Sequence, residues 1–307
     1  MAGYPTAIDN PNLSGTSIPM LYASRLLVAF YAATVLGAIA TTEHEGQVKN
    51  QGDTLRIRTL PTPNIRDHVE GQALQYDKPA PSYVDLVIDK GKYWSYEIGD
   101  VTIKQVDYNA VSNWSEHFAE YLKIAVDTDV LGGTYSSAHA SNAGNSAGAI
   151  SGNIALGVAG TPLALTATNV IGKIVECGQV LDEQNVPNVN RWMVLPAWVC
   201  SILKQSDIKD ASMMGDGKSV LRNGRIGMID RFEIFMSNSL TVASETNTPT
   251  SAMFGWKGAI AFASQMSKTE TLRNPTAFGD LCRSLQVYGY EVIKPEGLGH
   301  LFCYKGT

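Results

Sequence analysis

The spacing of hydrophobic and polar positions changes several times along the chain, and each change predicts a new element. In the first 19 residues, Pro5, Pro11 and Pro19 exclude a long helix, because proline lacks a backbone N–H and restricts the residue before it. We predict an extended arm without a core of its own. An apolar stretch then predicts a helix over residues 19–40, with proline in the first turn, where it is tolerated.

A strict alternation of apolar and polar residues follows and predicts β-structure. Residues 54–60 read TLRIRTL, and the strand-like segments 83–89 and 93–98 follow after a polar stretch. Lys90, Gly91 and Lys92 are expected to form a turn between the last two. The segment is therefore a long two-stranded excursion. Because a lone hairpin is barely stable in water, we expect this one to pack against a neighbouring subunit.

Apolar residues then recur at spacings of three and four and predict an amphipathic helix over residues 105–131. At about 1.5 Å per residue it would be about 40 Å long, which is the length of a structural strut. Gly132 and Gly133 are expected to end it. The apolar stripe consists of Val111, Trp114, Phe118, Leu122 and Ala125.

Residues 132–160 are dominated by Gly, Ala, Ser and Asn. Two interpretations stay open for them, a flexible loop and a segment that packs closely against another backbone. The second half of the chain mixes helix and strand patterns without a repeating βαβ order, which favours an α+β fold. Helices are expected over residues 169–185 and 197–204, and strands over residues 191–195, 227–236, 259–265 and 287–293.

The composition narrows the class of protein. Charged residues make up 17% of the chain, below the usual quarter, which fits a subunit that buries its surface in an assembly and equally a compact monomer with a large core. The net charge of −5 argues against a dedicated nucleic-acid binder. Residues 26–42 carry no charge, but they only reach the lower limit for a membrane span. We therefore prefer a buried helix there, and expect neither a signal peptide nor a membrane partner.

No pattern predicts catalysis, and no metal or cofactor site is expected. The four cysteines and five histidines are scattered, without a CxxC motif or the spacing of a zinc site. The nearest phosphate motif, SMMGDGKS at residues 212–219, has Ser212 where a P-loop requires glycine, so a surface turn is the better interpretation. Asp182 and Glu183 are interpreted as part of a solvated helix face. An enzyme is therefore not expected.

Several short segments together resemble a known family. They are GDTLRI at residues 52–57, VEGQAL at 69–74, YVDLVID at 83–89, LDEQNVP at 181–187, NRWMVLP at 190–196, SNSL at 237–240 and YGYEV at 288–292. In their order and spacing over about residues 50–295 they are similar to the major capsid proteins of tailed bacteriophages with the HK97-like fold.

The resemblance implies an α+β capsid fold with an N-terminal arm, an extended hairpin called the E-loop, a long spine helix in a peripheral (P) domain, and an axial (A) domain. The implied segments are the arm and first helix in residues 1–49, the E-loop in 50–100, the P domain with the spine helix in 101–165, the A domain in 166–285 and a return to the P domain in 286–307.

The resemblance also implies a function. Pentamers and hexamers of the chain would close an icosahedral shell around phage double-stranded DNA, in a virion assembled in the cytoplasm of the host bacterium. Besides the chain itself, the implied partners are a portal, packaged DNA in weak non-specific contact and an accessory cement protein. A separate scaffolding protein is implied because no long charged N-terminal extension is present. Two alternatives are an encapsulin-like nanocompartment and an enzyme on an unrelated α+β fold.

Charged residues of the hairpin are the candidates for ion pairs between subunits, although simple solubility of the hairpin explains them equally well. They are Arg56, Arg58, Arg66, Asp67 and Glu70. Lys78 and Lys90 also lie in this region, and we interpret them as ordinary solvated lysines rather than as partners in a covalent crosslink.

Overall fold

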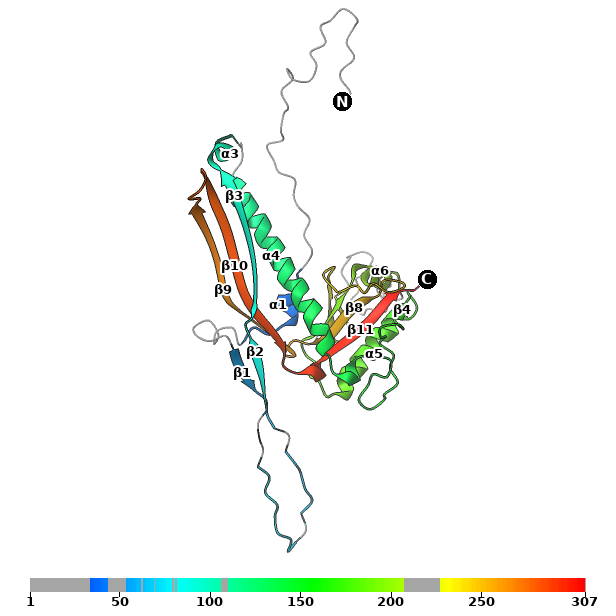
Figure 1. The fold of residues 1–307 in the computed structure, drawn as a ribbon. Helices are drawn as coiled ribbons and strands as arrows, with labels where there is room; N and C mark the ends of the chain where they lie inside the picture. The colour runs from blue at the N-terminus through cyan, green and yellow to red at the C-terminus, as the bar shows by residue number, and fades with distance from the viewer. Residues whose placement is uncertain are drawn as a thin grey trace, which may run out of the picture.

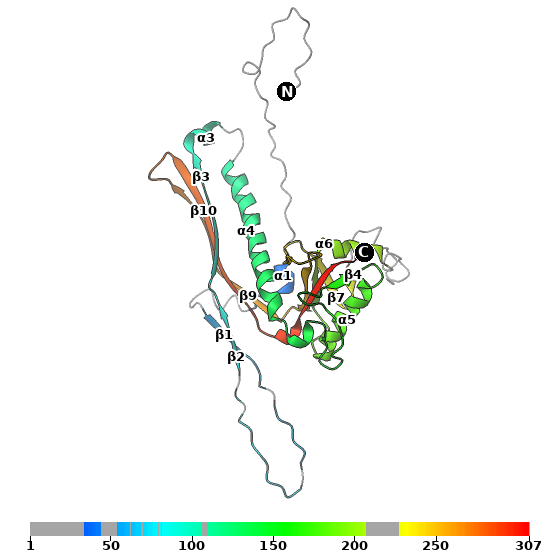
Figure 2. The ribbon, with the colours of Figure 1, turned by 45° about the vertical axis from the view of Figure 1, so that its right-hand side comes forward.

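The computed structural model describes residues 34–43, 54–61, 63–68, 70–78, 80, 82–105, 110–206 and 227–306. These residues form an elongated part and a compact part that lie side by side (Figures 1 and 2). The elongated part contains a two-stranded hairpin and a three-stranded sheet, and the compact part is built on a six-stranded sheet. The combination confirms the predicted α+β class.

The elongated part contains β1 (Thr54–Arg58), β2 (Tyr83–Val87), β3 (Lys90–Gly99), α3 (Asp100–Gln105), α4 (Ala110–Thr134), β9 (Ile260–Arg273) and β10 (Gly279–Val292). Strands β1 and β2 pair antiparallel, and the long sheet has the order β3-β10-β9. Helix α4 runs along this sheet (Figure 1). At about 1.5 Å per residue it is close to 40 Å long, as expected for a strut.

The compact part contains β4 (Leu163–Leu165), α5 (Val170–Glu183), β5 (Arg191–Leu195), α6 (Ala197–Gln205), β6 (Met228–Ile229), β7 (Phe232–Met236), β8 (Thr250–Trp256) and β11 (Leu298–Lys305), with short 3₁₀ helices at Tyr135–Ser137, Ala140–Asn142 and Pro295–Gly297. Its sheet has the mixed order β4-β11-β8-β5-β7-β6. Strand β9 belongs to the long sheet, whereas β11 lies between β4 and β8 in the compact one.

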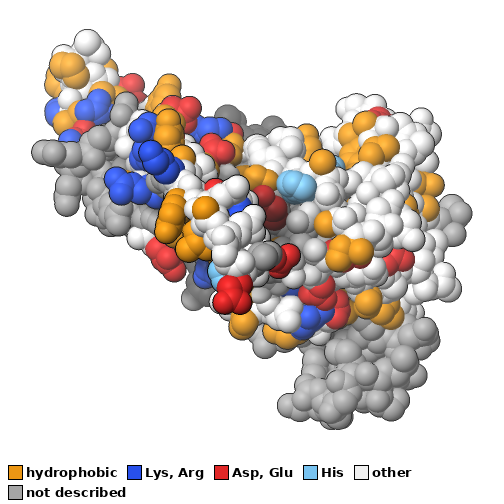
Figure 3. All heavy atoms as spheres, turned by 90° about the horizontal axis from the view of Figure 1, so that it is seen from below, with side chains coloured by type: hydrophobic (Ala, Val, Ile, Leu, Met, Phe, Trp, Pro, Cys, Tyr) orange, Lys and Arg blue, Asp and Glu red, His pale blue; other side chains and the backbone are white. Residues whose placement is uncertain are grey.

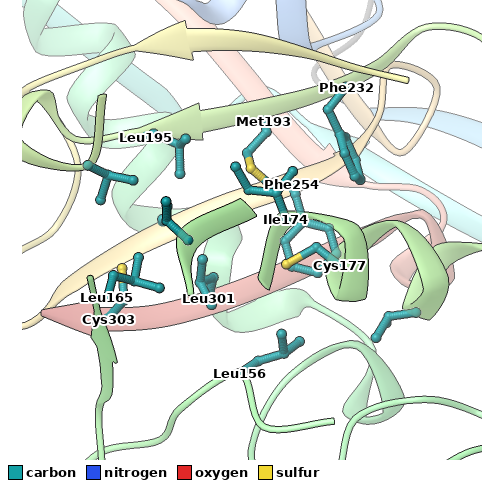
Figure 4. Close-up of a cluster of buried hydrophobic side chains, with 14 of the residues drawn as sticks. Leu156, Leu165, Ile174, Cys177, Met193, Leu195, Phe232, Phe254, Leu301 and Cys303 are labelled. Atoms are coloured by element: carbon teal, nitrogen blue, oxygen red, sulfur yellow. The ribbon is translucent and has the colours of Figure 1, made fainter. Parts of the chain in front are cut away.

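Both faces of the six-stranded sheet are buried. On one face, Ile174 and Cys177 of α5 pack with Phe254 and Leu301 from the sheet (Figure 4). On the other face, a second core joins the sheet to the C-terminal half of α4. Strand β5 serves both cores, and all five of its residues are buried. This explains why its sequence, RWMVL, is a nearly continuous apolar run rather than an alternation.

An aromatic cluster joins the other half of α4 to the long sheet. Trp94 and Tyr96 of β3 lie beside Trp114 and Phe118 of α4, with ring centroids 5.3–5.9 Å apart. The Tyr96 hydroxyl is also hydrogen-bonded to Ser115 at 2.8 Å. The even-numbered residues of β3 therefore face the helix, and its odd-numbered residues face away.

Two sequence predictions about chain breaks are wrong. Gly132 and Gly133 do not end the long helix, which continues to Thr134. A Cβ at Gly133 would overlap the hydroxyl of Tyr290, so this glycine permits a close approach instead of a stop. Lys90–Lys92 is not a turn, because these residues begin β3 and pair with residues 286–288 of β10.

The strands of the compact sheet were predicted less completely. The single strand expected over residues 227–236 is a hairpin, because Asp230 and Arg231 have positive φ angles and turn the chain between β6 and β7. Strands β8 and β11 were not predicted. Both are largely buried within the sheet, and neither shows the period-two alternation of a half-exposed strand.

The Gly-rich segment packs closely against another backbone, as one of the two interpretations held. A Cβ at Gly157 would overlap the carbonyl oxygen of Phe302 in β11. The loop around residue 150 is fixed by Glu183 at the end of α5, whose carboxylate accepts hydrogen bonds from the backbone N–H groups of Ile150 (2.8 Å) and Ser151 (3.0 Å). These hydrogen bonds lower the pKa of Glu183 to about 2.

Of the helix predicted over residues 19–40, residues 19–33 lie outside the described residues, and α1 (Leu36–Ile39) is the helical part within them. Its first turn is held by Asp127 of α4, whose Oδ1 accepts hydrogen bonds from the N–H groups of Val35 (3.0 Å) and Leu36 (2.9 Å). Burial raises the pKa of Asp127. The chain then joins β9 through a bridge between Thr41 and Ala261.

Candidate assembly surfaces

The β1–β2 hairpin is held together by its own side chains. Arg56 of β1 is directly opposite Asp85 of β2, and its guanidinium donates two hydrogen bonds to that carboxylate at 2.8 and 3.0 Å. The same guanidinium lies 3.9 Å from the ring centroid of Tyr83. The hydrogen bond with Arg56 lowers the pKa of Asp85. These contacts set the register of the hairpin within one subunit.

Beyond the hairpin, the described residues between 59 and 82 form an extended loop. Thr59 donates a hydrogen bond to the Ser82 carbonyl at 3.1 Å and closes the neck of the loop. Leu60, Ile65 and Tyr76 are 96%, 93% and 88% exposed. Exposed apolar side chains on a protruding segment are typical of a surface that another molecule covers.

The hairpin candidates for inter-subunit ion pairs are only partly available for that role. Arg56 is paired with Asp85, and Arg66 donates hydrogen bonds to Asp77 (2.7 Å) and to the Gln75 carbonyl (3.0 Å). The other three candidates are exposed and form no ion pair with the described residues. They are Arg58, Asp67 and Glu70. Their pairing with a second subunit stays a prediction.

The long sheet presents its second face to solvent. The odd-numbered residues of β3 line this face, and Tyr93 is 74% exposed. Together with Leu281 and Leu285 of β10 it lines a shallow groove of about 800 Å³. Glu270 bridges Arg283 and Lys268 at the side of this groove. We call this surface the outer groove. The sequence gives no sign of it, because the strands that form it are far apart along the chain.

A second, more polar groove of about 1,100 Å³ separates the hairpin from the compact part. Its walls come from β1, from the loop after α5 and from the turns around residues 257 and 295. Arg58 lies in this groove with Ile57 and Leu60. From below, hydrophobic side chains reach the surface of this end of the molecule in several places, with acidic and basic side chains between them (Figure 3).

Side-chain hydrogen bonds tie together the far end of the long sheet. Arg273 donates hydrogen bonds to Asp100 and to Asp280, and Asn274 donates one to Glu97 at 2.6 Å. The hydrogen bond with Arg273 lowers the pKa of Asp100. Between these anchors Phe278 projects with 86% of its surface exposed. It is a further exposed apolar residue that the sequence patterns did not single out.

Asp182 and Glu183 are anchors rather than a solvated face. Asp182 accepts hydrogen bonds from the buried Arg191 (2.7 Å) and from Arg231 (2.7 Å). Burial would raise the pKa of Asp182, but these two hydrogen bonds outweigh it and lower the pKa. Together with the Glu183 hydrogen bonds to residues 150 and 151, they fix two loops to the end of α5.

The described residues contain no group of three or more His, Cys, Asp or Glu side chains that could hold a metal ion. The P-loop-like segment 212–219 lies outside the described residues. Within the described part of the chain, no helix is long and apolar enough to cross a membrane. All four cysteines are buried and unpaired.

Comparisons with known proteins give a consistent result. The sequence model of a family described as phage capsid protein matches residues 84–298. A search of curated sequences found no match. Among solved structures, one from Mycobacterium phage Che8 is 25% identical with a TM-score of 0.77, over 93% of this chain and 97% of that one. The capsid of cyanophage P-SCSP1u is 17% identical with a TM-score of 0.72, over 94% of both chains. The mature capsid of bacteriophage PhiM1 is 12% identical with a TM-score of 0.69, over 96% and 97%.

Proposed function

Since the chain belongs to the family of phage capsid proteins and is a major capsid protein of the HK97-like fold, we propose that its pentamers and hexamers close an icosahedral shell around double-stranded DNA. The observation that carries this proposal is the protruding hairpin loop, whose apolar side chains have no core beneath them. A segment of this kind becomes stable when a second copy covers it.

The outer groove is the surface of the same chain that suits this loop. It offers Tyr93, Leu281 and Leu285, and the loop offers Leu60, Ile65, Leu74 and Tyr76. The loop of one subunit and the groove of the next are different surfaces, so the contact is head-to-tail, and repeating it around an axis closes a ring. The hairpin loop thereby extends the contact area beyond what a compact subunit could provide, and specific stable interfaces bury about 1,600 Å² in total.

The acidic balance of the chain, with a net charge of −5, suits a container that holds DNA by weak, non-specific contact, because tight non-specific binding depends on many Lys and Arg contacts to phosphates. The protein is a structural component of the virion. Assembly in the host cytoplasm, a portal, a separate scaffolding protein and an accessory cement protein belong to this proposal as well.

Cross-linking tests the contact between loop and groove. The four native cysteines are buried, so a bifunctional thiol cross-linker will react selectively with introduced, exposed cysteines. With Tyr76→Cys in the loop and Tyr93→Cys in the groove, the reagent should produce a ladder of covalent oligomers that ends at pentamers or hexamers. Each single variant should give no ladder. A double variant that assembles but remains monomeric after cross-linking would contradict the proposed contact.

A further inference from the structure

Three segments that are far apart in the sequence meet where the hairpin leaves the subunit. They are the first residue of β3, the C-terminal half of α4 and the C-terminal part of β10, which lie together at the lower end of the long sheet (Figure 1). Lys90 comes from β3, Asp129 from α4, and Tyr288 and Tyr290 from β10. From the sequence, Lys90 was expected to be solvated; its side chain is instead only 36% exposed.

The four side chains form one connected polar network. Lys90 Nζ donates a hydrogen bond to Tyr290 Oη at 2.8 Å and lies 3.4 Å from Asp129 Oδ2. Tyr288 Oη donates to the same carboxylate oxygen at 2.9 Å, and Tyr290 Oη donates to the Asp129 carbonyl at 3.0 Å. The hydrogen bond with Tyr290 raises the pKa of Lys90, so the ammonium stays charged.

Two glycines allow the segments around this network to approach one another closely. The missing side chain of Gly133 leaves room for the ring of Tyr290 against α4, and that of Gly289 leaves room for the carbonyl of Val87 at the end of β2. The pairing of β9 with β10 shifts register between Val287 and Tyr288, and the extra residue of this bulge lies in β9, between Ser264 and Met266. A bulge bends and twists the strand that carries it, so β9 bends beside Tyr288 of the network.

The base of the hairpin also has a small apolar core. Leu86 and Ile88 pack against Ala261 and Ala263 of β9. Apolar burial holds the base of the hairpin on the sheet, but it is non-directional. Hydrogen bonds depend on angle, so the polar network is the contact that can fix the direction of the hairpin.

We infer that Lys90, Asp129, Tyr288 and Tyr290 form a polar lock that sets the direction in which the hairpin leaves the subunit. The lock is partly exposed, with 36% of the Lys90 side chain and 29% of the Asp129 side chain open to solvent, and partly exposed ion pairs contribute only about 1 kcal/mol or less. It can therefore open without unfolding the core. The inference concerns a single subunit, so it can fail while shells still form.

Double electron–electron resonance, which measures the distribution of distances between two spin labels, tests the lock on the unassembled full chain. One label is placed by Arg58→Cys on β1 and the other by Glu116→Cys on α4, both at exposed positions, while the native cysteines are buried. Lys90→Met should broaden the distance distribution at least two-fold. Lys92→Met, two residues further along β3, is the matched control and should leave it as narrow as in the otherwise unaltered chain.

Tyr290→Phe removes a single oxygen and keeps the ring against Gly133, so it tests the lock even if Lys90→Met fails to fold. It should also broaden the distribution, with Tyr304→Phe on β11, which is partly buried and away from the network, as its control. Circular dichroism would establish that each variant is folded. A folded Tyr290→Phe chain with an unchanged distribution would overturn the inference, as would equal broadening in Lys92→Met.

Discussion

At the residue scale, Gly157 allows two segments of backbone to pack in direct contact. It has a φ angle of +84°, and the space that a Cβ would need is taken by the carbonyl of Phe302. The Gly-rich segment therefore approaches β11 backbone to backbone, and Phe302 N–H donates a hydrogen bond to the Leu156 carbonyl at 2.8 Å. A side chain at this position must push the segment away from the sheet.

We predict that Gly157→Ala lowers the free energy of unfolding by about 3 kcal/mol, because strain and overlap act together. Gly152→Ala is the matched control. Its φ angle is also positive, but no atom lies within 4 Å of the Cβ position, so it should cost only about 1 kcal/mol. Urea unfolding of the unassembled chain measures both values, and equal losses would show that the approach to β11 is unimportant.

His300 is a second residue with a measurable consequence. Its ring lies between those of Tyr135 and Phe302, with centroids 5.1 and 5.9 Å away, and burial lowers its pKa from 6.5 to about 4. The unfolded chain therefore binds a proton first as the pH falls. The neutral ring contributes its full stability above pH 6.5. This contribution is lost as the pH falls from 6.5 to 4, and the total loss is about 3 kcal/mol.

His300→Phe keeps an aromatic ring and removes this titration. The free energy of unfolding of the variant should consequently fall less between pH 7 and pH 4.5 than that of the unaltered chain. Urea titrations at a series of pH values provide the measurement. Parallel pH profiles for the two proteins would mean that His300 does not carry the effect.

At the scale of elements, the hairpin loop and the rest of the subunit are separable. The loop beyond the neck at Thr59 and Ser82 makes its described contacts within itself, through Arg66, Asp77 and the Gln75 carbonyl. The two main cores contain no residue of the loop. Folding of the subunit should therefore not depend on it, whereas assembly should.

Replacing residues 62–80 by a short turn should leave a folded subunit with nearly unchanged thermal stability but prevent closed shells. Circular dichroism and electron microscopy of the same preparation measure the two properties. Normal particles from the shortened chain would exclude the loop as an assembly element.

Elements were predictable from the sequence where one face is exposed to solvent and the other is buried. The alternation in β1 and the stripe on α4 predicted both elements to within a few residues. Strand β11 was missed because it is largely buried between β4 and β8, with Gly299 against the ring of Phe254. The outer groove and the polar lock could not be predicted, because pairing of β3 with β10 brings together residues almost 200 positions apart.

At the scale of the whole molecule, the low charge fraction of 17% left an assembly subunit and a compact monomer equally open. The structure favours the assembly, since exposed apolar residues lie on the hairpin loop, at the tip of the long sheet and along the outer groove. The hairpin loop extends away from both main cores (Figure 2) and contributes no residue to either. Its position becomes understandable when the same chain repeats around an axis.

Negative-stain electron microscopy of the purified full-length chain, over a range of concentration and salt and with and without the proposed scaffolding protein, tests the central claim most directly. We predict closed shells with icosahedral symmetry whose wall is built from this one chain. A chain that remains monomeric under every one of these conditions would contradict the account.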